Sequence, residues 1–353
     1  MKNLKLCLSV LFAMIVFSCQ NDESTQKSNS PTQEAQDTNL KRADCITHEI
    51  YQKQLAENPS LAFKRNQIES FTQNYINNVA NSNVQYRVGN TIVIPVVFNI
   101  LWSKESEKIS TGRCQSQINV LNRDFNGDNT DYEPGNVYNS VKGSIDVRFV
   151  LSKVNYKKVT NSVWDLDFGF DQMKDPGLGI RATDTERNLN IWVVGKITYS
   201  AFPGTIFAFA QMPGMENGAI RTDGIVSVFN TVGNIYSNLF PDDEKIFARN
   251  AYLGRTITHE VGHWMNLFHI WGDEQCGDDL VADTPTHDSA NYENDILPNV
   301  VHRSLCAGRP IEMYWNYMDY TPDRFRYMFT RGQANRMKAV FAPNGPRSKF
   351  SRE

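Results

Sequence analysis

The chain has 353 residues, of which 36 are Lys or Arg and 39 are Asp or Glu, so its formal net charge is −3. This balance gives no support to a nucleic-acid binder, because such proteins usually carry a basic surplus. Hydrophobic residues make up 41% of the chain and aromatic residues 11%, which suffices for a sizeable core and excludes bulk disorder. The length allows about two domains, and these totals do not separate an enzyme from an extracellular module.

The first residues have the pattern of an export signal. Lys2 and Lys5 precede an apolar run from Leu6 to Phe17, which is too short for a membrane span of about 20 residues and follows the layout of a signal peptide. We predict a signal peptide over residues 1–18. The residues around Cys19 resemble a bacterial lipobox, which implies lipidation of Cys19 and an outer-membrane or cell-surface lipoprotein. Ordinary cleavage and secretion are the alternative.

Two segments of different character follow this signal. Residues 19–44 are almost entirely polar and bury too little surface to offset chain entropy, so we predict a flexible tether. Residues 45–88 are helical in pattern, with apolar residues spaced three and four apart between Ile68 and Val79. We predict a helical pro-segment there, followed by one catalytic domain over residues 89–345.

Strand and helix patterns interleave in the predicted catalytic domain. The run Ile92–Phe98 is typical of a buried strand, and Pro95 within it indicates a sheet edge or a bulge. Apolar periodicity predicts further strands at residues 145–151, 189–193 and 224–228, and a helix at residues 118–125. The apolar spacing from Phe247 to Trp264 predicts a long helix. This interleaving predicts an α/β or an α+β fold.

The segment from His259 to His269 carries the pattern His-Glu-x-x-His-x-x-Asn-x-x-His. At about 100° per residue, helix positions four apart face the same side, so His259 and His263 can bind one zinc ion. Glu260 can reach a water in the open coordination position. His269 joins the same ion only if the helix stops before it, and Asn266 suits the left-handed conformation that ends helices. Three histidines and a water make a catalytic zinc site, whereas a structural site has four protein ligands.

This segment resembles the extended zinc motif of the metzincin metallopeptidases, and residues 258–273 are similar to the pappalysin family, particularly its cytophagalysin-like bacterial members. The run Asn316-Tyr317-Met318-Asp319-Tyr320 resembles the Met-turn of that family. The resemblance implies that Met318 forms an apolar floor under the histidines and that Tyr320 stabilises the tetrahedral intermediate. It also implies a metzincin-type domain. Its upper subdomain, residues 89–270, holds a twisted, mostly parallel sheet and the zinc helix, and an irregular lower subdomain, residues 271–345, holds the Met-turn.

Four cysteines remain after the signal and Cys19. Cys276 and Cys306 flank the loop-rich region after the zinc motif, where an exported protein permits a disulfide, and we predict this pair. The residues around Cys45 resemble the Arg/Cys segment at the start of pappalysin pro-regions, which implies that the Cys45 thiolate occupies the fourth zinc position of a silent zymogen. A disulfide between Cys45 and Cys114 and an inert thiol are the alternatives.

Two acidic features follow the zinc motif. Pappalysin-like enzymes hold calcium near an acid-rich turn, and hard oxygen ligands suit that ion. The resemblance implies a calcium loop here, formed by Asp278, Asp279, Asp283 and Thr284; a solvated acidic loop is the alternative. Asp323 matches an acid that in some of these peptidases lines the pocket for the residue after the cut. This match implies a preference for Arg or Lys there, and surface solvation is the alternative.

The sequence therefore predicts an exported zinc endopeptidase that acts on proteins or peptides, with zinc and calcium as expected cofactors. Glu260 accepts a proton from zinc-activated water and delivers it to the leaving amine, while zinc and Tyr320 stabilise the oxyanion. One alternative is a catalytically silent, peptide-binding or adhesive lipoprotein, which would need neither side chain. The other is an amidase acting on cell-wall peptides. No nucleic-acid partner is expected, and membrane contact is expected only through the lipid anchor.

Overall fold

The computed structural model describes residues 45–81, 91–131, 133, 135–216, 222–240, 245–296 and 301–350. All of these belong to one contact unit of the chain. The predicted signal peptide, Cys19 and the predicted tether lie outside the described residues, as does the predicted boundary after residue 88. Within the described ranges, every helix is too short or too polar to cross a membrane.

A five-stranded sheet with the order β3-β1-β5-β9-β8 forms the centre of the fold. Its strands are β1 (Ile92–Trp102), β3 (Val147–Lys158), β5 (Leu189–Val194), β8 (Ala208–Ala210) and β9 (Ile225–Val228). The first three and β9 run parallel, and β8 runs antiparallel to β9. The predicted strands and the mostly parallel sheet are therefore confirmed, and β8 is an edge strand of that sheet.

Pro95 lies in a central strand, so its interpretation as a sheet-edge residue is wrong. Pairing of β1 with β5 begins at Val96, and at Pro95 the strand pairs with Val150 of β3. The register with β3 shifts between Val96 and Val97. A bulge is therefore present next to Pro95, and at Pro95 itself the strand pairs only with β3.

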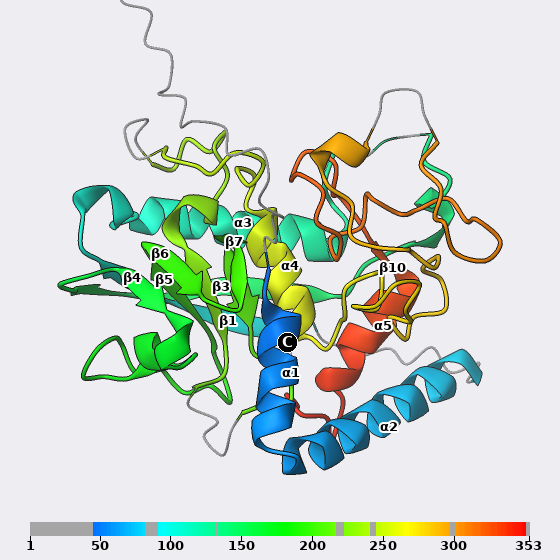
Figure 1. Ribbon diagram of the computed structural model, residues 1–353, viewed down its shortest axis with the longest axis horizontal. Coiled ribbons are helices and arrows are strands. Elements are labelled where there is room, and N and C mark those ends of the chain that lie inside the picture. The colour runs from blue at the N-terminus through cyan, green and yellow to red at the C-terminus, as the bar shows by residue number, and fades with distance from the viewer. Residues whose placement is uncertain are drawn as a thin grey trace, which may run out of the picture. The chain divides into compact units, whose positions relative to one another are not determined.

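Helices cover one face of this sheet and a smaller sheet covers the other (Figure 1). The helices on the sheet are α3 (Thr111–Asn126) and α4 (Arg255–Trp264), and α5 (Arg331–Val340) packs into the same core beside them. They share a core with β1 side chains such as Ile94 and Phe98. The small sheet is formed by β4 (Val163–Asp165), β6 (Lys196–Tyr199) and β7 (Phe202–Ile206). Its Trp164 and Ile197 pack with Trp192 of β5.

The helical pattern predicted over residues 45–88 forms two helices, α1 (Thr47–Glu57) and α2 (Ser60–Asn81). Pro59 separates them, because proline is accepted before or in the first turn of a helix and not in its interior. α2 packs against α5, and α1 contacts the edge strand β8 (Figure 1). The segment is therefore docked on α5 and on the edge of the main sheet.

The long helix predicted from Phe247 to Trp264 is wrong in its first half, because α4 begins at Arg255. Gly254 has φ +83° and Asn250 has φ +70°, and both angles are incompatible with an α-helix. Phe247 packs against Phe240 instead of extending the apolar stripe of α4.

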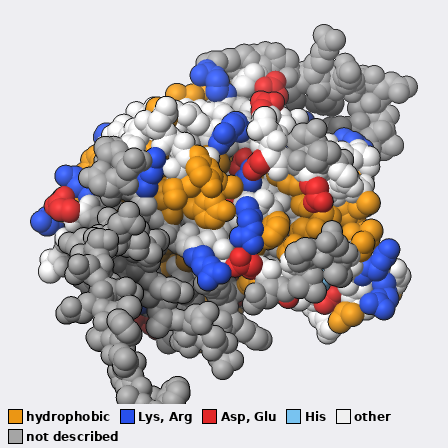
Figure 2. Space-filling view, turned by 90° about the horizontal axis from the view of Figure 1, so that it is seen from above, with side chains coloured by type: hydrophobic (Ala, Val, Ile, Leu, Met, Phe, Trp, Pro, Cys, Tyr) orange, Lys and Arg blue, Asp and Glu red, His pale blue; other side chains and the backbone are white. Residues whose placement is uncertain are grey.

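After Ile270 the chain is irregular as far as α5, apart from the two-stranded pairing of β10 (Phe329–Thr330) with β2 (Lys142–Gly143). Short 3₁₀ turns join the other elements: Glu105–Glu107, Asn139–Val141, Leu166–Phe168, Gln172–Lys174, Phe229–Thr231 and Glu293–Asp295. The predicted Cys276–Cys306 disulfide is present in this region. Figure 2 shows basic and acidic side chains interspersed on one face, in keeping with the balanced composition.

Candidate active site

Three histidine side chains converge at the centre of the molecule. His259 and His263 lie one turn apart on α4, and His269 follows the end of that helix. The Nε2 atom of His263 lies 3.1 Å from Nε2 of His259 and 3.1 Å from Nε2 of His269. Two nitrogens bound to one tetrahedral zinc at about 2.0–2.1 Å would lie about 3.3 Å apart. The spacing of the three rings therefore fits one zinc ion.

The second ring nitrogen of each histidine fixes its tautomer. Nδ1 of His259 lies 2.7 Å from the Tyr317 carbonyl oxygen, and Nδ1 of His263 lies 2.9 Å from that of Leu267. A carbonyl only accepts, so both Nδ1 atoms donate and both Nε2 atoms carry lone pairs. Burial lowers the pKa of His263 to about 3, which keeps that ring neutral. Converging lone pairs cannot satisfy one another, and a bound cation would satisfy all three.

The helix ends where His269 requires it to end. Asn266 has φ +76°, and the Leu267 N–H donates to the Gly262 carbonyl at 3.0 Å. This is the left-handed helix terminus expected of Asn266. The Arg336 Nε atom donates to the Asn266 carbonyl at 2.8 Å, which holds the turn against α5. The chain therefore reverses at Asn266, and His269 returns to the metal position.

Met318 lies directly under α4, as expected of a Met-turn residue. It is fully buried, and a Cβ atom added at Gly262 would lie 2.5 Å from the Met318 sulfur. The Met318 N–H donates to the Asn316 side chain at 2.9 Å, and its carbonyl accepts from Ile270 at 3.2 Å. The absence of a side chain at Gly262 thus permits the close approach of the Met318 sulfur to α4. Met318 contacts α4 at Gly262 and the backbone that follows His269 at Ile270.

Asp273, which the sequence did not single out, supports the third histidine. Its carboxylate accepts from Nδ1 of His269 and forms an ion pair with Nδ1 of His48 at 3.1 Å. Burial alone would raise the pKa of Asp273, but His269 and His48 outweigh it and hold that pKa well below its usual range. A carboxylate behind a metal-binding imidazole fixes the tautomer and strengthens the ligand.

We expect Asp273→Asn to weaken zinc binding about 10- to 100-fold, because the anion behind His269 is lost. The measurement is competition between a chromophoric zinc chelator and protein from which residues 45–88 have been removed. Glu274→Gln, which removes an exposed neighbouring carboxylate, is the matched control. An unchanged zinc affinity in Asp273→Asn would show that Asp273 does not support the ligand.

Glu260 and Tyr320 border the three histidines, and residues that precede or begin α1 contact both. The Thr47 hydroxyl donates to Glu260 Oε2 at 3.0 Å, and the Tyr320 hydroxyl donates to the Cys45 carbonyl at 2.8 Å. The other Glu260 oxygen is buried without a hydrogen-bond partner among the described residues. Burial raises the pKa of Glu260 to about 8. Residues at the start of the predicted pro-segment therefore occupy the positions beside both Glu260 and Tyr320.

Cys45 completes the cluster. Its sulfur and the three imidazoles offer ligand atoms that all lie within 4.8 Å of one another, the only such convergence among the described side chains. Burial raises the pKa of the Cys45 thiol well above its usual value, and the Glu260 charge adds to this effect. Cys114 is a buried residue of α3 and belongs to the main core. The alternative of a Cys45–Cys114 disulfide is therefore wrong, since neither residue is disulfide-bonded.

Asp323 is fully buried, so the alternative of surface solvation is wrong. Its Oδ2 atom accepts from the backbone N–H of Leu253 at 2.7 Å and of Arg255 at 3.3 Å, and its Oδ1 atom pairs with Arg326 at 2.7 Å. The carboxylate thus fixes the chain at the start of α4. Arg326 balances much of its charge.

The acidic turn after the zinc motif does not form a cluster of converging carboxylates within the described ranges. Asp283 accepts from Thr330 Oγ1 at 2.6 Å and from the Gly332 N–H at 2.9 Å, both at the start of α5. Asp279 Oδ1 accepts from Thr284 at 2.8 Å, while Asp279 Oδ2 is buried without a described partner. Asp278 is exposed. The solvated-loop alternative therefore fits Asp278 but does not fit Asp279.

Known proteins share these features. The family model described as pregnancy-associated plasma protein-A matches residues 243–342. An extracellular metalloprotease of Pyricularia oryzae is 29% identical over 237 residues, which cover 66% of this chain and 68% of that protein. One of Arthroderma otae is 28% identical over 251 residues, covering 70% and 76%. These relatives are named metalloproteases, and a metalloprotease site is what three converging imidazoles and a neighbouring carboxylate suit.

Solved structures extend the likeness to the fold. Mature mirolysin of Tannerella forsythia in complex with a cleaved peptide has a TM-score of 0.64 and 30% identity, covering 73% of this chain and 95% of that chain. A promirolysin mutant from the same organism has a TM-score of 0.71 and 27% identity, covering 87% and 96%. With the converging histidines, the Asn266 helix end and the Met-turn, these matches show that the chain belongs to the pappalysin family of metzincins and is a zinc metalloendopeptidase.

Proposed function

We propose that this protein is the exported precursor of a zinc endopeptidase in which His259, His263 and His269 hold the metal and Glu260 is the general base. The observation that carries the proposal is the convergence of three lone-pair-bearing Nε2 atoms beside a buried carboxylate on the same helix. Bound zinc would lower the pKa of a water toward about 7 and polarise the scissile carbonyl.

The protein's own groups would move the proton and stabilise the charge. Glu260 takes a proton from the attacking water and passes it to the leaving amine. The Tyr320 hydroxyl, once released from the Cys45 carbonyl, donates to the developing oxyanion. Asn266 and Met318 hold the third histidine and the floor of the site in place. Preorganised groups of this kind need no rearrangement during the reaction.

We propose that residues 45–88 are a pro-segment that keeps the enzyme silent. Cys45 Sγ lies among the imidazoles, Thr47 engages Glu260, and the Cys45 carbonyl engages Tyr320. Each group needed for catalysis is thus already occupied by this segment. The promirolysin structure covers more of this chain than the mature one does, 87% against 73%, which supports a shared pro-region.

The signal peptide over residues 1–18 and lipidation of Cys19 complete the proposed route to the cell surface. The name extracellular metalloprotease, shared by the fungal relatives, supports export. Mass spectrometry of the N-terminal peptide from membranes tests the anchor. An N-terminal diacylglyceryl-cysteine at Cys19 is the expected result. An unmodified N-terminus on protein found in the medium would show that the protein is secreted and not lipid-anchored.

Specificity for Arg or Lys after the cut is proposed from Asp323. Since Arg326 already pairs with this carboxylate, we expect only a modest preference, roughly fivefold, of the size of a partly balanced ion pair. The measurement compares kcat/KM for two peptides that differ only in Arg or Leu after the scissile bond. Equal kcat/KM values for the two peptides would show that Asp323 does not select the residue after the cut.

Calcium binding in the acidic turn is proposed from Asp279. Its buried, unpartnered oxygen suits a cation, and in the absence of one, burial raises the pKa of Asp279 to about 7. Because the folded-state pKa lies above the unfolded one, the carboxyl stabilises the fold below about pH 4, and this contribution is lost as the pH rises through 7. The loss is at most about 4 kcal/mol.

We therefore expect the free energy of unfolding in EGTA to fall between pH 5 and pH 8, and to fall less in Asp279→Asn. Calcium at pH 8 should restore the stability of the unsubstituted protein and not that of Asp279→Asn. Denaturant titrations at both pH values measure this, with Asp278→Asn as the control. If the substitution leaves the pH dependence intact, Asp279 is not the titrating group.

Casein hydrolysis after limited proteolysis tests the proposed function. We expect cleavage to appear as residues 45–88 are removed, to stop with a zinc chelator, and to return with added zinc. Cleavage of cell-wall peptides with intact casein would favour the amidase. Zinc binding without hydrolysis of either substrate would favour the silent peptide-binding protein.

A further inference from the structure

An apolar surface beside the metal centre is covered by the pro-segment. Met212 and Met215 follow β8, Phe268 follows α4, and both methionines are almost completely buried. Their partners in this cluster are Tyr51, Leu55 and Leu61, which all belong to α1 or α2. The Tyr51 and Phe268 rings meet edge to face at 6.3 Å.

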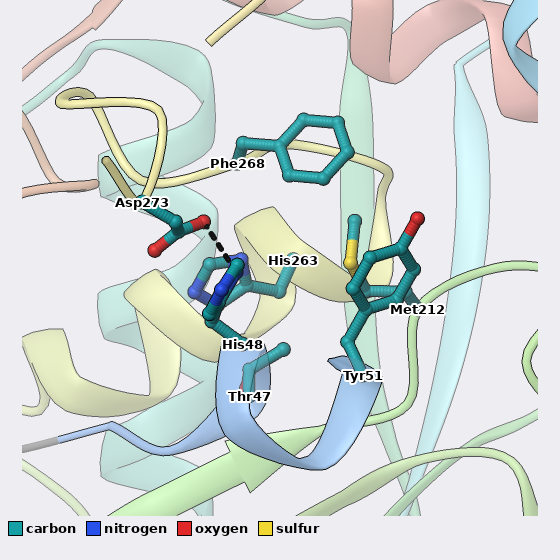
Figure 3. Close-up of a pocket in the computed structure, with 7 residues that line it drawn as sticks. All are labelled: Thr47, His48, Tyr51, Met212, His263, Phe268 and Asp273. Atoms are coloured by element: carbon teal, nitrogen blue, oxygen red, sulfur yellow. Dashed lines mark ion pairs between the residues drawn. The ribbon is translucent and has the colours of Figure 1, made fainter. Parts of the chain in front are cut away.

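This surface is continuous with the catalytic site. Figure 3 shows Met212 and Phe268 around the crevice in which Thr47, His48 and Tyr51 of α1 face His263 and Asp273. The Arg336 guanidinium lies 5.4 Å from the Phe268 ring, so the catalytic domain itself holds that ring in place. If the pro-segment leaves, as the proposed function requires, large apolar side chains become accessible next to a zinc ligand. Exposed apolar patches of this kind mark binding sites.

A chain that pairs with the edge strand β8 lies next to this apolar surface. Cys45 bridges to Ala208 of β8, the Ile46 N–H donates to the Ala208 carbonyl at 3.3 Å, and Thr47 Oγ1 accepts from the Ala210 N–H at 2.9 Å. An extended substrate would use the same free edge by strand addition. Met212 lies two residues beyond the end of β8. At about 3.3 Å per residue, an extended chain paired with β8 reaches it within a few residues.

The direction in which a substrate chain would cross the site follows from what lies at the two ends of α4. Asp323 binds the backbone at Leu253 and Arg255, before and at the first residue of α4, whereas Phe268 lies beyond its last turn. These ends are about 15 Å apart. With the residue after the cut toward Asp323, the residues before the cut extend toward Met212 and Phe268.

We propose that Met212, Met215 and Phe268 form a subsite for a large apolar side chain, such as Leu, Met or Phe, two or three residues before the scissile bond. The pro-segment fills this subsite with Tyr51, Leu55 and Leu61 until it is removed. Methionine side chains adapt to several apolar shapes, so the subsite selects for size and hydrophobicity.

The test uses the processed enzyme and peptides that differ only in Leu or Ser at the second and third positions before the cut. We expect kcat/KM to favour Leu by at least about tenfold at one of them. Met212→Ala and Phe268→Ala should each reduce this ratio to below about threefold, through slower hydrolysis of the Leu peptide. Phe168→Ala, which removes an exposed ring of another region, should leave the ratio as it is.

Phe268 directly precedes the ligand His269, so its substitution acts next to the metal site. Met212 lies on a different loop, so Met212→Ala tests the subsite independently. Zinc content identifies any variant whose metal site is disturbed. No preference in the unsubstituted enzyme, or a preference that survives both substitutions, would overturn the subsite while leaving the peptidase intact. A processed protein that cleaves no peptide at all would overturn the proposed function and this inference together.

Discussion

Glu260→Ala should lower kcat/KM for peptide hydrolysis by about 10⁴-fold, the upper range for loss of a general acid–base group. The substitution removes the buried carboxylate and leaves the three imidazoles intact. Zinc content should therefore stay at that of the unsubstituted protein. Peptide kinetics and metal analysis on the same processed sample give both results.

Glu260→Gln separates the chemistry of Glu260 from its shape. The amide keeps the size of the side chain and an oxygen for Thr47, but it cannot accept the proton. We expect a loss similar to that of Glu260→Ala, with Glu274→Gln fully active. Full activity in either Glu260 variant would contradict the assignment of the base.

Cys45→Ser should raise the activity of the unprocessed precursor about 10- to 1,000-fold. The thiolate is the strongest zinc ligand that the pro-segment offers, and an open state populated at about 0.1–10% becomes dominant when that ligand is lost. The measurement is the initial rate of peptide hydrolysis by the intact precursor, with gel analysis to exclude processing during the assay.

Cys114→Ala is the matched control for the latency of the precursor, because Cys114 is a second buried thiol that is not part of the histidine cluster. It should leave the precursor silent. A silent Cys45→Ser precursor that becomes active on removal of residues 45–88 would show that Thr47 and the α1 contacts suffice for latency and that the thiolate is not required.

The zinc motif was predictable from sequence because its geometry is local. Helical periodicity places His259 and His263 on one face, and the left-handed preference of asparagine at position 266 ends the helix before His269. The four parallel strands of the main sheet were equally readable from their apolar runs, whereas the short edge strand β8 was not predicted. Phe247 misled the helix prediction, because an apolar spacing cannot reveal that Gly254 and Asn250 take positive φ.

The rest of the site depends on contacts between distant segments. Thr47 meets Glu260 across 213 residues, a pairing that no local pattern contains. Asp273 follows the turn at Gly272, where no regular period applies. Its one readable signal was an acid four residues after the last histidine, since carboxylates often support such ligands. Asp323 was found only by resemblance, and its pairing with Arg326 was not readable from the sequence.

X-ray absorption at the zinc edge, measured on the intact precursor and on the processed enzyme, tests whether three histidines hold the zinc and whether Cys45 occupies its fourth position. The precursor should show three nitrogen ligands and one sulfur, from His259, His263, His269 and Cys45. Processing should replace the sulfur by a light atom and leave the three nitrogens. A precursor without sulfur at zinc, or fewer than three imidazoles in either form, would contradict the account.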